Sequence, residues 1–196
     1  MDKRTKEALR YLGYGKNEVD QIILSMIRES FEELQEIAAP KYVYQIYELI
    51  LLAEKEIEIS NLHITSKHLY ENLKGCDKAA VFAVTLGTEV DRRLRQYEVI
   101  RISKAVVFQA CAATFLEEYC DGIESQIRDE MRIDEKCIRP RFSPGYGDFS
   151  ITHQEDILRM VDAQKRIGLT MTESYMLTPT KSVTALIGIY GTKERN

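Results

Sequence analysis

The segment from Arg141 to Phe149 contains the residues with the clearest capacity to bind a ligand. It reads Arg-Phe-Ser-Pro-Gly-Tyr-Gly-Asp-Phe. Its proline biases Ser143 toward an extended conformation, whereas Gly145 and Gly147 permit backbone conformations that are closed to other residues. Arg141 offers a forked, permanent cation that suits a carboxylate. The segment therefore predicts a loop that holds a small charged ligand or, more simply, a β-turn ahead of a helix.

Two further blocks follow the Arg-x-x-x-Gly-Tyr motif in a definite order. The first is Gly-Leu-Thr-Met-Thr-Glu-Ser over residues 168–174, and the second is Met-x-x-Pro-x-x-Ser-Val-Thr over 176–184. Upstream, residues 77–87 end in Ala-Val-Thr-Leu-Gly. Together these blocks resemble the activation domain of cobalamin-dependent methionine synthase. The resemblance covers roughly residues 70–190, and residues 1–65 diverge from the family.

The resemblance implies a function in reactivating an oxidised cobalamin. It implies that the chain binds S-adenosylmethionine (AdoMet) and docks on a cobalamin-binding methionine synthase that lacks its own activation domain. A flavodoxin- or ferredoxin-type protein would supply the electron, so that cob(II)alamin becomes methylcobalamin. The chain would position two reactants without acid–base chemistry, and no residue is assigned a catalytic role.

The resemblance also implies which residues would contact AdoMet. Arg141, Gly145 and Tyr146 carry over from the family motif, with Arg141 for the ligand carboxylate and Tyr146 near the sulfonium. The backbone from Ser143 to Gly147 would serve the adenine and the ammonium. Four further candidates have an alternative structural role, namely Asp148, Glu117, Glu173 and Ser174.

Two other interpretations stay open. The chain can be a non-catalytic module that binds a corrinoid protein without useful AdoMet affinity, because the sequence after the motif tyrosine departs from the family pattern. It can also serve another corrinoid methyltransferase on the same scaffold. A Rossmann-type methyltransferase is disfavoured, because no strand leads into a Gly-x-Gly loop at a helix start.

The composition is that of one ordinary globular domain, expected to span residues 1–196. The formal charge of −4 disfavours a nucleic-acid partner. No N-terminal apolar segment or bilayer-length run is present, so a cytoplasmic protein without a membrane partner is expected. The four cysteines lack Cys-x-x-Cys spacing and the three histidines are scattered, so no metal site is expected.

Helical and strand patterns are mixed without regular βαβ alternation, which predicts an α+β fold with an antiparallel sheet. The family resemblance adds the expectation of a C-shaped domain around a twisted sheet. Helices are predicted over 4–12, from Asn17 to Pro40, over 66–73, from Thr88, over 99–131 and over 152–167. The long helix should bury a stripe that includes Ile102 and Val106. Strands are predicted within 41–64 and over 79–85, 169–172 and 182–190.

Overall fold

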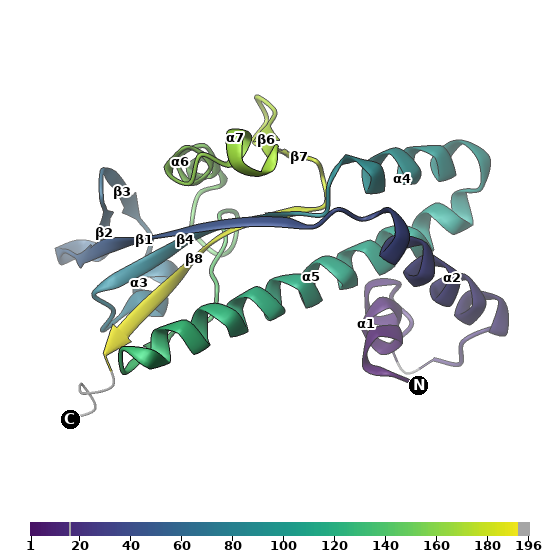
Figure 1. Cartoon of the computed structure of the whole chain (residues 1–196), viewed down its shortest axis with the longest axis horizontal. Coiled ribbons are helices and arrows are strands. Elements are labelled where there is room, and N and C mark those ends of the chain that lie inside the picture. Colours follow the sequence, from purple (N-terminus) through teal and green to yellow (C-terminus); the bar gives the residue numbers. More distant parts are fainter. Residues whose placement is uncertain (16, 192–196) are drawn as a thin grey trace. The chain divides into compact units, whose positions relative to one another are not determined.

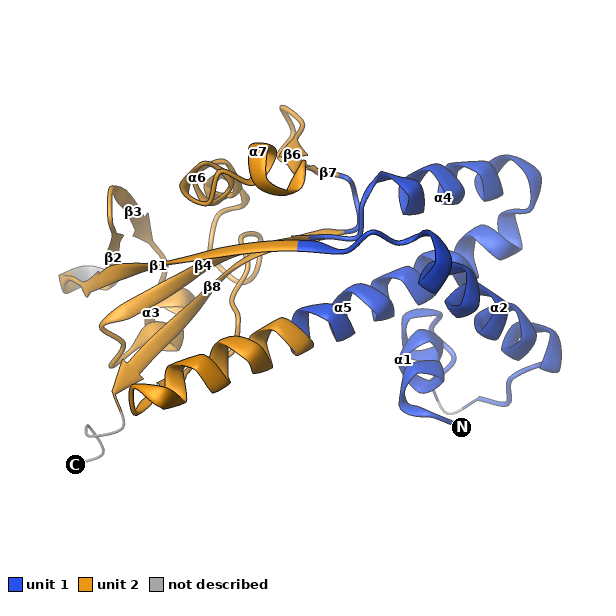
Figure 2. Ribbon diagram, in the orientation of Figure 1, with its two compact units in different colours: residues 1–41, 85–121, 179–181 blue, residues 42–84, 122–178, 182–196 orange. Residues whose placement is uncertain are grey.

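A computed structural model of the chain describes residues 1–15 and 17–191. It divides into two compact units, each built from segments that are distant in sequence (Figure 2). The first unit contains residues 1–41, 85–121 and 179–181, and the second contains 42–84, 122–178 and the chain from Ser182 onward. The expectation of a single domain over the whole chain stays a prediction.

The first unit is helical (Figure 1). It contains α1 (Lys3–Tyr11), α2 (Gln21–Ile37), α4 (Thr88–Ile100) and the first part of α5 (Ile102–Ile133). The predicted start of the second helix at Asn17 is wrong. Asp20 is its N-cap, because the Asp20 carboxylate accepts a hydrogen bond from the amide of Ile22 at 2.9 Å.

The long helix begins three residues later than predicted. Arg101 has an extended backbone with φ −159° and ends α4, so Val99 and Ile100 belong to α4. Ile102 and Val106 are 68% and 55% exposed, which contradicts their placement in the buried stripe. The buried face of α5 in this unit instead includes Ala105, Phe108, Cys111 and Ala112.

The second unit is built on a six-stranded antiparallel sheet in the order β3-β2-β1-β4-β8-β5. Only the first residue of β1 and the last of β4 fall outside this unit. The strands are β1 (Lys41–Leu51), β2 (Glu56–Ile59), β3 (Leu62–Thr65), β4 (Lys78–Thr85), β5 (Lys136–Ile138) and β8 (Ser182–Gly191). The predicted α+β class with an antiparallel sheet is confirmed.

Short elements complete the second unit. They are η1 (Ala53–Lys55), α3 (Lys67–Leu73), η2 (Ile151–His153), α6 (Gln154–Met160), α7 (Ala163–Ile167), β6 (Thr170–Met171) and β7 (Leu177–Thr178). The single helix predicted over 152–167 is wrong in one respect. Asp162 adopts a left-handed conformation with φ 52° and separates α6 from α7. Gly168 ends α7 with φ 71°, as the sequence predicts.

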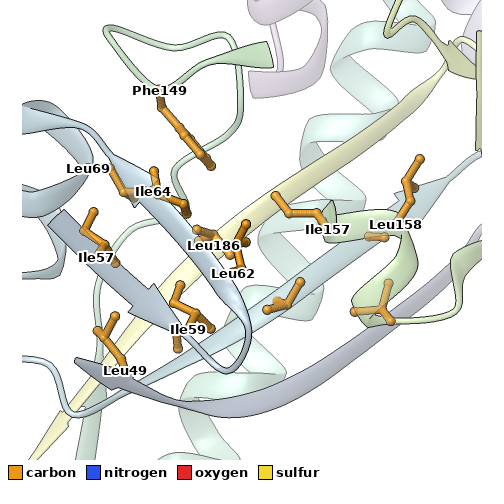
Figure 3. Close-up of a cluster of buried hydrophobic side chains, with 14 of the residues drawn as sticks. Leu49, Ile57, Ile59, Leu62, Ile64, Leu69, Phe149, Ile157, Leu158 and Leu186 are labelled. Atoms are coloured by element: carbon orange, nitrogen blue, oxygen red, sulfur yellow. The ribbon is translucent and has the colours of Figure 1, made fainter. Parts of the chain in front are cut away.

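The core of the second unit joins the sheet to its helices and to the candidate loop. Figure 3 shows side chains from β1, β2, β3, α3, α6 and β8 gathered in one cluster. Phe149, at the end of the loop, points into this cluster and is 1% exposed. Burying an aromatic side chain of this size stabilises the fold by roughly 2 kcal/mol, so the core holds the loop at that end.

No helix of the described residues is both long enough and apolar enough to cross a membrane. The same residues contain no group of three or more His, Cys, Asp or Glu side chains that could hold a metal ion.

Candidate ligand-binding loop

The loop that carries the Arg-x-x-x-Gly-Tyr motif is joined to the edge of the sheet. Phe142 and Leu186 of β8 exchange two backbone hydrogen bonds of 2.9 Å. The loop then closes on itself, since the amide of Gly145 donates to the carbonyl of Phe149 at 2.8 Å and the amide of Tyr146 to that of Ser143 at 3.2 Å. The backbone of this segment is therefore ordered by its own hydrogen bonds.

Both loop glycines stand where another residue would be strained. Gly145 has φ +87° and Gly147 has φ +60°. A Cβ atom on Gly147 would lie 2.5 Å from Nδ1 of His68, and one on Gly145 would lie 3.2 Å from Cδ1 of Ile151. The backbone at Gly147 therefore lies directly against the side chain of His68 in α3.

Asp148 connects the loop to the start of α3. Its carboxylate accepts hydrogen bonds from the Ser66 hydroxyl at 2.6 Å, from the amide of Lys67 at 2.8 Å and from the amide of His68 at 3.1 Å. The Ser66 hydrogen bond, followed by the amides of His68 and Lys67, lowers the pKa of Asp148 to about 2. Asp148 was considered either as a ligand contact or as a structural residue, and these hydrogen bonds within the chain correspond to the structural role.

Tyr146 presents its ring to solvent at the tip of the loop. It is 70% exposed, and its ring meets Phe142 edge to face at 5.3 Å between centroids. Phe142 in turn packs against the buried Phe149 at 6.3 Å, and Phe149 stacks on His153 at 5.5 Å. These ring contacts connect the exposed ring of Tyr146 to the buried core through Phe142 and Phe149.

Arg141 already faces a carboxylate of its own chain. Its Nη1 donates to Oε2 of Glu124 on α5 at 2.9 Å, with side chains that are 20% and 13% exposed. The other oxygen of Glu124 accepts from Arg128 at 3.1 Å. Sequence reasoning missed Glu124, Arg128 and Ser66. For Glu124 and Arg128 the only signal was their i,i+4 spacing, which gives no hint of Arg141.

The remaining candidates lie elsewhere. Glu173 and Ser174 are exposed in the turn between β6 and β7, where the Ser174 hydroxyl lies 2.9 Å from that of Thr172. Glu117 belongs to the part of α5 in the first unit, where its charge contributes to the raised pKa of Tyr11 after the larger effect of burial. The second unit therefore contains every candidate except Glu117.

Comparison with known proteins identifies a related family and a related fold. No curated protein matches the chain. A solved structure described as the "MetH Reactivation Domain bound to AdoHcy" matches with a TM-score of 0.66 and 17% identity. That match covers 94% of this chain and 70% of the other, and at this identity it shows a shared fold.

A family model named "Vitamin B12 dependent methionine synthase, activation domain" matches residues 66–194. The matched range includes the loop, the turn at Glu173 and the last strand, so it contains all three blocks of the sequence motif. Because this model spans more than half of the chain, the protein belongs to the family of vitamin B12 dependent methionine synthase activation domains.

Proposed function

We propose that this protein binds AdoMet at the Arg141–Phe149 loop and serves as a reactivation component for a cobalamin-dependent methionine synthase. The carrying observation is the ordered loop itself, which lies in the family-matched range and carries both Arg141 and the exposed aromatic ring of Tyr146. The related reactivation-domain structure is bound to S-adenosylhomocysteine (AdoHcy), which supports a ligand of the same class.

In the proposed reaction, the chain binds the methyl donor and orients it. In reductive methylation, one electron and the methyl group of AdoMet are delivered to cob(II)alamin on the partner, which gives methylcobalamin and S-adenosylhomocysteine. The chain's share is to hold the methyl donor in place, a contribution that needs no nucleophile or proton relay. A flavodoxin- or ferredoxin-type donor and a partner that lacks its own activation domain complete the proposal.

Within the loop, Arg141 is proposed for the ligand carboxylate and Tyr146 for the sulfonium. A guanidinium pairs with a carboxylate through parallel hydrogen bonds, and an aromatic face attracts a cation. Ser143, Gly145, Gly147 and Asp148 complete the proposed site as the backbone frame around these two side chains.

Calorimetric titration with AdoMet tests the proposal. Wild-type protein is expected to show saturable binding, and Arg141→Ala is expected to lose it. Arg132→Ala is the matched control, because Arg132 also pairs with an acid but is 69% exposed on α5. Retention of wild-type affinity by Arg141→Ala would contradict the site. Absence of wild-type binding, both alone and with a cobalamin-loaded methionine synthase fragment, would favour a non-catalytic binding module.

A further inference from the structure

The helical first unit contains a pocket that is separate from the candidate loop. A cavity of about 470 Å³ is lined by the end of α1, by α4 and α5, and by Lys181. All of these lining residues belong to the first unit. The volume falls within the range of roughly 300–1,000 Å³ that is usual for small-molecule sites. The pocket is therefore large enough for a small organic ligand.

The apolar wall of this pocket consists of side chains that the fold leaves exposed. Ile102 and Val106 on α5 and Tyr11 on α1 are 68%, 55% and 42% exposed, and all three line the cavity. Ile102 and Val106 lie one helical turn apart, so they form one apolar surface on the same side of α5. Removing such a surface from water favours an apolar ligand. A ligand with a hydrocarbon body would therefore fit this wall.

Lys181 places a cation in the same pocket. The amide of Leu86 donates to the Lys181 carbonyl at 2.9 Å. The preceding residue, Thr180, donates from its amide and from its hydroxyl to the Asp91 carboxylate, both at 2.7 Å. From this fixed backbone, the Lys181 ammonium donates to the carbonyl of Gln109 on α5 at 3.4 Å. The fold therefore sets the position of the cation.

The surroundings of Lys181 favour a carboxylate as a further partner of its ammonium. Burial lowers the pKa of Lys181, because water is partly removed from the charge, and the charge of Asp91 opposes this decrease. A carboxylate beside the ammonium would compensate for the lost hydration through a charge-assisted hydrogen bond. Glu98, an exposed acid that also lines the pocket, would repel a second negative charge. A ligand with one carboxylate is thus favoured over a phosphate or a dicarboxylate.

We propose that this pocket binds an apolar monocarboxylate, such as a medium-chain fatty acid. The carboxylate pairs with Lys181, and the hydrocarbon chain lies against Ile102 and Val106. The pocket belongs to the first unit, whereas the loop proposed for AdoMet belongs to the second. The two sites share no residue, so this second site does not depend on the proposed function.

Octanoate is the probe for this site, and ¹³C-methyl NMR of the full chain is the measurement. Octanoate is expected to shift the methyl signals of Ile102 and Val106 saturably, and to leave that of Ile64, buried in the second unit, unchanged. Butyrate, which is four methylene groups shorter, is expected to bind at least about tenfold more weakly. Octanol has the same chain without the charge, and it is expected to bind about tenfold more weakly than octanoate.

Three variants separate the charge from the apolar wall. Lys181→Met removes the charge and keeps an unbranched side chain, so it should weaken octanoate by about tenfold and change octanol by less than about twofold. Lys74→Met is the matched control, because it removes the same charge from an exposed lysine of the second unit, and it should change neither ligand. Val106→Ser should weaken both ligands by about threefold. Thermal unfolding of each variant checks that the fold is intact.

Three results would overturn the inference. If Lys181→Met leaves octanoate affinity unchanged, or weakens octanoate and octanol equally, the carboxylate does not pair with Lys181. If octanoate shifts neither Ile102 nor Val106, the pocket is not its site. If the wild type sediments as a dimer that Val106→Ser dissociates, a second copy of the chain covers these residues instead. Each of these results leaves AdoMet binding at the loop to its own titration, so the two proposals fail separately.

Discussion

Asp148 and Ser66 are 82 positions apart in sequence, yet the Ser66 hydroxyl donates a 2.6 Å hydrogen bond to the Asp148 carboxylate. Ser66 is also the N-cap of α3 and accepts from the amide of Leu69 at 3.1 Å. One helix start therefore anchors the end of the candidate loop. The position of Tyr146, two residues before Asp148, depends on this attachment.

The Asp148 anchor predicts a specific pH dependence. Because the folded-state pKa is lowered from 3.8 to about 2, the carboxylate contributes stability that is fully present above pH 4. That contribution is lost as the pH falls through the folded value. Thermal unfolding of wild type and Asp148→Asn between pH 2 and pH 6 is expected to differ at pH 6 and to converge near pH 2. A gap that is constant across this range would contradict the prediction.

Gly147 is expected to tolerate no side chain. Gly147→Ala combines a positive φ with a Cβ atom 2.5 Å from Nδ1 of His68, and should cost about 1–3 kcal/mol in the free energy of unfolding. Gly75→Ala separates the two effects, because Gly75 has φ +78° but no neighbouring atom within 4 Å of its would-be Cβ. Urea denaturation should show a larger loss at Gly147, and His68→Ala should recover part of it. Equal losses at the two glycines would exclude the contact with His68.

Gln154 is expected to act as a buried link between α6, the β6–β7 turn and β8. Its Nε2 donates to the carbonyl of Tyr175 and its Oε1 accepts from the hydroxyl of Thr184, both at 2.9 Å. Gln154→Leu should cost about 2 kcal/mol, because it leaves these buried groups unpaired. Thr184→Val should lower the free energy of unfolding by less in the Gln154→Leu variant than in the wild type. Urea denaturation of the wild type, the two single variants and the double variant measures this difference. Additive losses would show that the two side chains are not coupled.

Tyr146 is expected to matter for ligand binding and little for folding. Its ring is 70% exposed, so Tyr146→Ala should change the free energy of unfolding by no more than about 0.5 kcal/mol. The same variant should bind AdoMet about tenfold more weakly, which corresponds to ~1.4 kcal/mol. Tyr146→Phe keeps the aromatic face and should retain most of the affinity. A large loss with phenylalanine would assign the contribution to the hydroxyl group instead.

The sequence by itself determined the elements whose signals are local. Ser66 and Gly75 bound a short helix, and α3 is found between them at Lys67–Leu73. The apolar run over 79–85 became the buried strand β4. The breaker residues Pro144, Gly145 and Gly147 excluded a helix or strand within the loop. These predictions succeed because each depends on a residue and its nearest neighbours along the chain.

Only the tertiary structure decided which side chains meet. Arg141 reads as a cation for a ligand, but folding places Glu124, on α5, against it. Likewise, the α5 pattern marks Ile102 and Val106 as apolar, yet both are exposed. A repeat of 3.6 residues identifies an apolar side of a helix, but the elements that pack against the helix determine what is buried. Contacts between distant segments leave no local signal, so the loop could be predicted from sequence while its partners could not.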